Sequence, residues 1–227
     1  MGANEPVTSL IQTKLWIGGE FRPAQGNATF IKLNPEQDTP MAESARASVE
    51  DVKLAVEAAH AAFPSYRMTT PGQRETWLSK AADLLEQRAE DFINVLIEEG
   101  GSPLFKAQFE VKFSIDALRT AAGIPRRVTG MTLPSDVPGR FSMATRSPLG
   151  VFACITPFNV PLIKAFVECS GPLATGNTVV MLASEEAPVV AIRVAELLRD
   201  AGFPAGSFNV LTGYGHEIGD TLVTHPH

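Results

Sequence analysis

The sequence predicts an α/β fold in which a doubly wound parallel sheet, incomplete in this chain, joins an N-terminal helical layer and a protruding β-hairpin. Three observations lead to this fold class. Apolar strands alternate with amphipathic helices after residue 149, helical periodicity dominates the first half, and a segment rich in turn residues separates the two. With 227 residues, 44% of them hydrophobic, the chain can bury a sizeable core. We divide it into residues 1–127, 128–148 and 149–227.

The first part of the chain is predicted to hold peripheral strands followed by helices. Segments 14–21 and 28–33 favour extended structure, and we expect them to pair, with a glycine-rich turn between them. Ser48 begins a capping box, and apolar residues at three- and four-residue intervals after it predict a helix. A second helix is expected over 71–99 and a third over 104–122.

The segment 128–148 changes from helical periodicity to short β-favouring pieces around the turn residues Pro134–Gly139. This pattern predicts a β-hairpin. A two-stranded hairpin of this size cannot bury its own faces. We therefore expect it to lie on another surface, either of its own domain or of a neighbouring subunit.

The last part of the chain, 149–227, alternates strictly between strands and helices. The predicted order is strand 149–155, helix 160–170, strand 178–182, helix 187–201, strand 207–211 and a helix that opens near His216. Successive apolar strands with helical crossovers predict a Rossmann-like parallel sheet with helices on both faces.

Composition argues against several classes of function. The net charge is −6 and the 19 Lys and Arg residues form no basic run, so a nucleic-acid partner has no support. No apolar run reaches the roughly 18 residues that a membrane span needs. The first residues also lack the pattern of a signal peptide. We expect a cytoplasmic protein with no membrane partner.

Cysteine and histidine usage predicts no metal site and no nucleophile. The four histidines and two cysteines match no zinc-ligand spacing. Cys154 lies inside an apolar strand and is typical of a small buried hydrophobic residue, whereas Cys169 is expected nearer the surface. No histidine stands in local reach to activate Cys169, so we assign neither thiol to catalysis.

The residues just after each strand of the predicted sheet are the candidates for ligand binding, because ligands of such sheets bind beyond the carboxyl ends of the strands. They are Thr156–Asn159 after the first strand, Ser184 and Glu185 after the second, and Gly213–Gly219 after the third. We expect these groups to line one crevice.

Each candidate also has a purely structural interpretation. The glycines suit either the close approach of a diphosphate or tight packing of a helix on a strand. Glu185 suits either hydrogen bonding to ribose hydroxyls or the solvation of a helix end. Asn159 suits either donation to a developing oxyanion or capping of the helix near residue 160. The residues alone leave these alternatives open.

In their order and spacing, the segments ITPFNVPL, GPLATGNTVVMLASEEAP and AGFPAGSFNVLTGYGHEIG resemble the aldehyde dehydrogenase superfamily. KLWIGGEF and EGGSP are similar to the opening segment and a helix end of that family, so the resemblance covers nearly the whole chain. It implies an enzyme that acts on a small aldehyde with NAD as cofactor. It also implies a homo-oligomer, a dimer or tetramer, that assembles through the 128–148 hairpin.

The resemblance implies roles for individual residues. Asn159 matches the asparagine whose amide helps to form the oxyanion hole, and Glu185 matches the ribose-binding carboxylate. The other implied cofactor contacts are Ile155, Thr156, Pro157, Phe158, Leu182, Ser184, Gly215 and Gly219. One wall of the substrate channel is implied to consist of Val160, Lys164 and Val167.

Three departures from the family pattern bear on these roles. Leu182 stands where a lysine is common, which removes a cation able to bind a ribose hydroxyl or a 2′-phosphate and so favours NAD over NADP. Glu168 stands where the family carries another lysine, and Lys164 is placed one turn earlier to pair with it. Phe158 replaces a more common tryptophan.

The general-base glutamate and the nucleophilic cysteine of the family come later in sequence than His227. We therefore expect the chain to be the amino-terminal half of an aldehyde dehydrogenase, inactive alone. Its parent is implied to oxidise an aldehyde to a carboxylic acid through a cysteine thiohemiacetal and a thioester. Two alternatives stay open: a non-catalytic nucleotide-binding or assembly piece, and an enzyme that passes the acyl group to coenzyme A.

Overall fold

The main sheet contains five strands in the order β3-β2-β10-β9-β8 in the computed structural model, which describes residues 10–227. The absence of a signal-peptide pattern concerns mainly residues 1–9, which lie outside the described residues. Three strands are parallel, namely β8 (Val151–Ile155), β9 (Thr178–Leu182) and β10 (Phe208–Leu211). Two antiparallel strands extend the sheet beyond β10, namely β2 (Leu15–Ile17) and β3 (Glu20–Arg22).

Helices cover both faces of this sheet, as predicted. One face packs on α5 (Pro161–Ala174) and α6 (Pro188–Ala201), and the other packs on α1 (Val49–Tyr66) and α7 (Gly215–Val223). Successive side chains of β9 alternate between these two apolar clusters, and all five of its residues are buried. Burial on both faces explains why its sequence, TVVML, is a nearly continuous apolar run.

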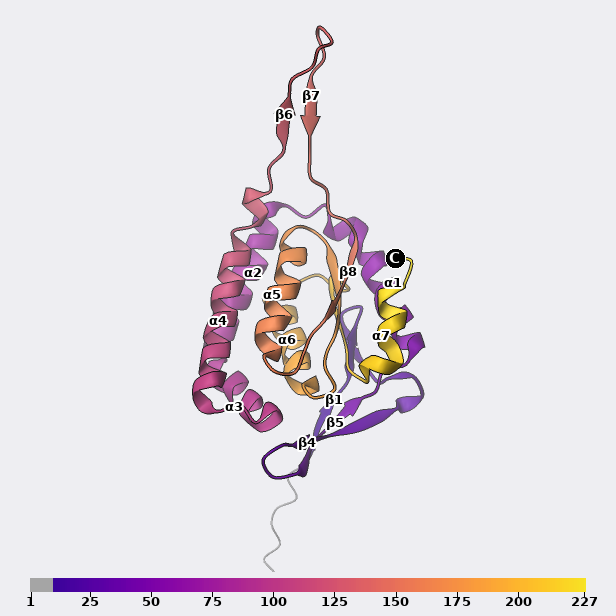
Figure 1. Cartoon of the computed structure of the whole chain (residues 1–227), viewed down its shortest axis with the longest axis vertical. Helices are drawn as coiled ribbons and strands as arrows, with labels where there is room; N and C mark the ends of the chain where they lie inside the picture. The colour runs from indigo at the N-terminus through magenta and orange to yellow at the C-terminus, as the bar shows by residue number, and fades with distance from the viewer. Residues whose placement is uncertain (1–9) are drawn as a thin grey trace, which may run out of the picture.

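A further helical layer lies outside α5 and α6 (Figure 1). It consists of α2 (Pro71–Gln87), α3 (Ala89–Gly100) and α4 (Leu104–Ala122). The prediction of one helix over 71–99 was wrong. Arg88 leaves the helical conformation (φ −103°, ψ 19°), and its guanidinium pairs with Asp200 of α6 at 2.7 Å. This tertiary contact holds the break between α2 and α3.

The predicted pairing of the N-terminal strands was also wrong. Gly18 and Gly19 close the hairpin of β2 with β3, and β2 joins the main sheet beside β10 instead of lying at the periphery. Segment 28–33 belongs to a second sheet of β1 (Ile11–Thr13), β4 (Thr29–Asn34) and β5 (Thr39–Ala45), in the order β1-β5-β4. Single-turn 3-10 helices occupy Gln25–Asn27 and Pro125–Arg127.

The predicted hairpin forms from β6 (Met131–Leu133) and β7 (Ser142–Ala144). It projects from one end of the body, opposite the β1-β5-β4 sheet, as Figure 1 shows. Its large apolar side chains are exposed, namely Val128, Met131, Leu133, Val137, Phe141 and Met143. Across residues 10–227, every helix is too short or too polar to cross a membrane.

Candidate functional site

Asn159 lies in the loop that joins the carboxyl end of β8 to α5. Pro157 precedes it and Pro161 is the first residue of α5, so the chain cannot continue the strand ladder here. The N-cap position is occupied by Val160, whose side chain cannot accept a hydrogen bond. The interpretation of Asn159 as a helix cap is therefore wrong. Its side chain is exposed, and no hydrogen bond to its amide comes from the rest of residues 10–227.

The N-terminus of α5 is instead capped from α4. The buried carboxylate of Glu110 accepts the backbone N–H of Leu162 at 2.8 Å. Lys106, one turn earlier on α4, pairs with the other oxygen of Glu110 at 3.2 Å. This arrangement leaves the amide of Asn159 available to a ligand.

The N-terminus of α6 is capped in the same way from α3. The two oxygens of the buried Glu99 carboxylate accept the N–H groups of Val189 at 2.6 Å and Val190 at 2.9 Å. Burial raises the pKa of Glu99 to about 7, against the opposing effect of these two hydrogen bonds and of Lys32. Glu99, and not Glu185, therefore accepts the amides at the start of α6.

Sequence reasoning missed Glu99 and Glu110, although a signal was present. Glu99 follows Phe92 and Leu96 at helical spacing on the buried side of α3. Glu110 lies between buried residues of α4 at the same kind of spacing, Ala107 and Ser114. A carboxylate on the apolar stripe of a helix is rarely buried unless it has a partner, so both positions indicated a buried contact.

Glu185 lies at the carboxyl end of β9 and lines a cavity of about 200 Å³. The other lining residues are Phe30, Ile31, Lys32, Leu33, Glu186 and Tyr214. The neighbouring carboxylate of Glu186 is already bound by Lys32 at 2.7 Å. Glu185 is half-buried and makes no side-chain hydrogen bond within the described range 10–227, so its oxygens can accept hydrogen bonds from a ligand.

The glycines after β10 divide between the two interpretations. Gly213 has φ +146°, and a Cβ there would lie 3.1 Å from the backbone nitrogen of Ala47, so tight packing explains it. A Cβ on Gly215 or Gly219 would meet nothing within 4 Å. These two glycines leave open space beside the first turns of α7.

The N-terminus of α7 differs from those of α5 and α6. Tyr214 is its N-cap and supplies no side-chain hydrogen bond. Glu217 in the first turn is paired with Arg46 through two hydrogen bonds, one of them 3.0 Å long from Nε. The same guanidinium lies 4.9 Å from the ring centre of Tyr214, and that ring packs against Phe30. The charge of Glu217 is thus paired with Arg46 at the protein surface.

The remaining predicted cofactor residues lie along the same edge. Ile155 and Phe158 are exposed, and Pro157 is half-buried. Thr156 is buried and donates its backbone N–H to the carbonyl of Leu182 at 3.0 Å. The side chain of Leu182 is only 1% exposed and belongs to the core, so it has no surface to offer a cofactor.

Ser184 shapes the loop after β9. Its hydroxyl oxygen accepts the N–H of Glu186 at 3.2 Å, and its carbonyl accepts the N–H of Ala187. Both bonds stabilise the turn that carries Glu185.

The predicted substrate wall lies on α5. Val167 is 48% exposed, Val160 is half-buried, and Lys164 pairs with Glu168 at 3.1 Å, which confirms the predicted pair. Val167 lines an apolar cavity of about 450 Å³ together with Phe113 of α4.

Two aromatic residues of this surface were not predicted. Phe109 and Phe113 are 59% and 43% exposed, and their ring centres are 5.8 Å apart. The sequence signal that could have found them is their spacing: they are four residues apart and fall outside the apolar stripe of α4.

Both thiols are buried, so the prediction that Cys169 lies near the surface was wrong. Its position in the middle of α5 turns it toward β8. Hydrogen bonding to Cys154 and burial raise the pKa of the Cys169 thiol well above its usual value, which disfavours a thiolate. Between residues 10 and 227, no group of three His, Cys, Asp or Glu residues is arranged to hold a metal ion.

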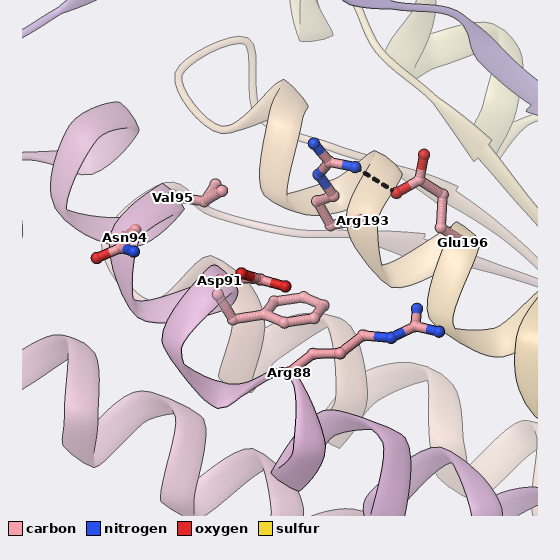
Figure 2. A pocket seen from close by; sticks show the side chains of 7 residues that line it. Arg88, Asp91, Asn94, Val95, Arg193 and Glu196 are labelled. Atoms are coloured by element: carbon pink, nitrogen blue, oxygen red, sulfur yellow. Dashed lines mark hydrogen bonds and ion pairs between the residues drawn. The ribbon is translucent and has the colours of Figure 1, made fainter.

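A larger cavity of about 510 Å³ lies between α3 and α6 and contains none of the strand-end residues. Figure 2 shows charged side chains reaching into it from α6 and from the α2–α3 junction. Arg193 pairs with Glu196 at 2.8 Å, and Arg88 is held by Asp200. Since its cations are paired within the protein, this cavity is not the candidate site.

The chain matches known proteins over nearly its whole length. The model of the aldehyde dehydrogenase family matches residues 21–227. A vanillin dehydrogenase from Pseudomonas fluorescens is 38% identical over 220 residues, which are 96% of this chain and 45% of that protein. The chain belongs to the aldehyde dehydrogenase family. It spans about half the length of the curated relatives that it matches.

Solved structures agree with this assignment. A salicylaldehyde dehydrogenase from Pseudomonas putida G7, complexed with salicylaldehyde, superposes with a TM-score of 0.92 at 32% identity, over 95% of this chain and 45% of that one. An NAD-dependent benzaldehyde dehydrogenase from Corynebacterium glutamicum gives 0.90 at 36% identity, over 94% and 47%. Both confirm the predicted fold class.

Proposed function

We propose that the protein containing this chain is an NAD-dependent aldehyde dehydrogenase that oxidises an aldehyde to a carboxylic acid. The observation that carries the proposal is the pair of unengaged polar groups at one edge of the sheet. The amide of Asn159 follows β8 and the carboxylate of Glu185 follows the adjacent strand β9. Aldehyde oxidation with a dinucleotide needs two polar groups at that edge: a donor to the oxyanion and an acceptor for the ribose hydroxyls.

The residues present fit a dinucleotide. Glu185 accepts hydrogen bonds from the adenosine ribose, and the open first turns of α7 at Gly215 and Gly219 accept the diphosphate. The bound dinucleotide supplies the hydride acceptor. The carboxylate of Glu185 disfavours a 2′-phosphate at the ribose, and Leu182 brings no compensating cation, so NAD is favoured over NADP.

Asn159 stabilises the negative charge that develops on the aldehyde oxygen. When a thiolate attacks the carbonyl carbon, the C=O bond electrons move to oxygen, and the side-chain N–H of Asn159 donates to that oxyanion. The two buried thiols of this chain cannot reach a substrate. We therefore place the nucleophile, and the base that activates water for hydrolysis of the thioester, in a part of the protein outside this chain.

An aromatic aldehyde is the substrate class that the exposed wall supports. Phe109, Phe113 and Val167 form an apolar surface from α4 and α5 on which an aromatic ring can pack. The three relatives described above are named for vanillin, salicylaldehyde and benzaldehyde, all of which are aromatic.

The β6–β7 hairpin supports a homo-oligomer. Its apolar side chains have no cover within the described residues, and a second copy of the chain would bury them. Removal of apolar surface from Met131, Phe141 and Met143 is expected to shift the assembly toward monomers in light scattering. An unchanged mass would contradict the assignment.

The test uses the protein that contains this chain, incubated with benzaldehyde and either NAD or NADP, with and without coenzyme A. We expect NADH and benzoic acid with NAD, at a higher kcat/KM than with NADP. Formation of benzoyl-coenzyme A in place of benzoic acid would contradict hydrolysis and show that the acyl group is transferred to coenzyme A. Absence of reduced cofactor with benzaldehyde under all of these conditions would contradict the proposal and favour a nucleotide-binding or assembly role.

A further inference from the structure

We infer that Glu99 and Glu110 are positioning residues through which the outer helical layer holds the two loops of the site. Glu99 fixes the loop after β9, which carries Glu185, and Glu110 fixes the loop after β8, which carries Asn159. The inference rests on the proposed function for its kinetic consequences.

The two caps differ from the local caps elsewhere in the chain. The helices α1 and α2 begin with capping boxes built from their own residues, at Ser48 and Thr70. Neither α5 nor α6 has a side-chain cap of its own. Their first amides instead bind carboxylates from helices that are distant in sequence, so the start of each helix is tied to another layer.

Glu99 of α3 holds the loop after β9 through the start of α6. Both of its oxygens are used, by Val189 and Val190, and its side chain is fully buried. The loop is held on its other side by the ion pair of Glu186 with Lys32, a residue of β4 that is 7% exposed. Both anchored points follow Glu185 within five residues, so they restrict the segment that carries its carboxylate into the cavity.

Glu110 holds the loop after β8. One oxygen of its carboxylate accepts a hydrogen bond from the backbone N–H of Leu162, three residues after Asn159. Its second oxygen is bound by Lys106, whose ammonium also donates to Ser102 at 2.8 Å. Loss of the hydrogen bond from Leu162 to Glu110 should free the first turn of α5 and the loop residues before it, so the amide of Asn159 is no longer held in position.

The two residues are expected to affect different steps. Glu99→Gln should raise the KM for NAD about tenfold with kcat changed less than about twofold, since it disturbs cofactor binding. Glu110→Gln should lower kcat about tenfold with the KM for NAD nearly constant, since it disturbs the oxyanion donor. Glu98→Gln is the matched control because Glu98 is adjacent to Glu99 but exposed, and it should change neither constant.

Hydrogen exchange gives a readout that does not depend on activity. Glu99→Gln should speed exchange in residues 183–192 and leave 156–165 unchanged, and Glu110→Gln should do the reverse. If the wild-type protein makes no NADH, the proposed function fails while exchange still decides whether the carboxylates hold the loops. Where a Gln variant does not fold, the Asp variant, which keeps the charge but shortens the reach, replaces it.

The inference is overturned if both variants change the same kinetic constant equally. It is also overturned if they lower only the thermal midpoint, with kinetic constants and local exchange like those of Glu98→Gln.

Discussion

The helices α6 and α7 both begin at the carboxyl edge of the main sheet, but their first amides meet different partners. In α6 they bind the buried carboxylate of Glu99. In α7 they have no side-chain cap, and the glycines at positions 215 and 219 leave open space beside them. The first helix terminus is closed by the protein itself, and the second is available to an anion.

This difference shows why helix position alone does not locate a phosphate site. Every helix N-terminus offers unpaired N–H groups and a favourable dipole to an anion. At α5 and α6 an internal carboxylate already uses them, and this frees Asn159 and Glu185 from capping. For this reason we propose α7, and not α5 or α6, as the helix that binds the diphosphate.

Replacement of Asn159 tests the free amide with the largest expected effect. Asn159→Ala should lower kcat about 10²-fold, because it removes an oxyanion donor, and should leave the KM for NAD unchanged. The side chain is exposed and unbonded within residues 10–227, so the thermal midpoint should stay constant. Steady-state kinetics with unchanged kcat would remove Asn159 from the site.

Replacement of Glu185 tests the free carboxylate. Glu185→Gln should weaken NAD binding about tenfold, because a hydrogen bond to a charged acceptor is lost. Titration calorimetry with NAD measures this directly. Glu186→Gln is the matched comparison, since that carboxylate is engaged by Lys32, and it should weaken NAD binding less. Equal effects of the two variants would contradict the ribose assignment.

The glycines after β10 test the open terminus with smaller effects. Gly215→Ala should lower NAD affinity severalfold while the free energy of unfolding is kept, because its Cβ would meet no atom of residues 10–227 within 4 Å. Gly213→Ala should cost about 1–3 kcal/mol of stability, since its φ of +146° is strained for alanine. Urea unfolding and NAD titration of both variants separate the two roles, and a stability loss at Gly215 would place it in packing instead.

The buried carboxylate of Glu99 at the N-terminus of α6 should make the stability of the protein depend on pH. The pKa of Glu99 is about 7 in the folded protein against an ordinary 4.5, so the folded state binds more protons between these values. The contribution of Glu99 to the unfolding free energy of the wild-type protein therefore falls as pH rises through this range, and Glu99→Gln lacks this contribution. Urea unfolding measures the difference in unfolding free energy between the wild-type protein and Glu99→Gln. We expect this difference to change in favour of the variant between about pH 5 and about pH 8. The nearby charges of Lys32 and Glu186 are common to both proteins, and a pH-independent difference would contradict the buried titration.

Much of the inner sheet could be predicted because β8 to β10 appear as apolar runs, and two of them, β9 and β10, are buried on both faces. Strands β8 to β10 and helices α5 to α7 fall within a few residues of their predicted ranges. Strand β5 could not be predicted, since TPMAESA contains a proline and residues of low β-propensity, and only its pairing with β4 and β1 makes it a strand.

The position of the candidate residues at the strand ends could be predicted from the topology. That their side chains are not used by the protein itself could not. Whether Asn159 caps α5 depends on Glu110, which lies 49 residues earlier by sequence number and reaches it only through the packing of α4 on α5. The burial of Cys169 likewise depends on which side of α5 faces β8. Such contacts between layers are absent from local sequence patterns.

A crystal structure of the protein containing this chain with bound NAD tests the central claim most directly. We predict the adenosine ribose within hydrogen-bond distance of Glu185 and the diphosphate beside Gly215 at the start of α7. The carboxylate of Glu99 should still bind Val189 and Val190. A diphosphate on the first amides of α6, with Glu99 displaced, would contradict the account.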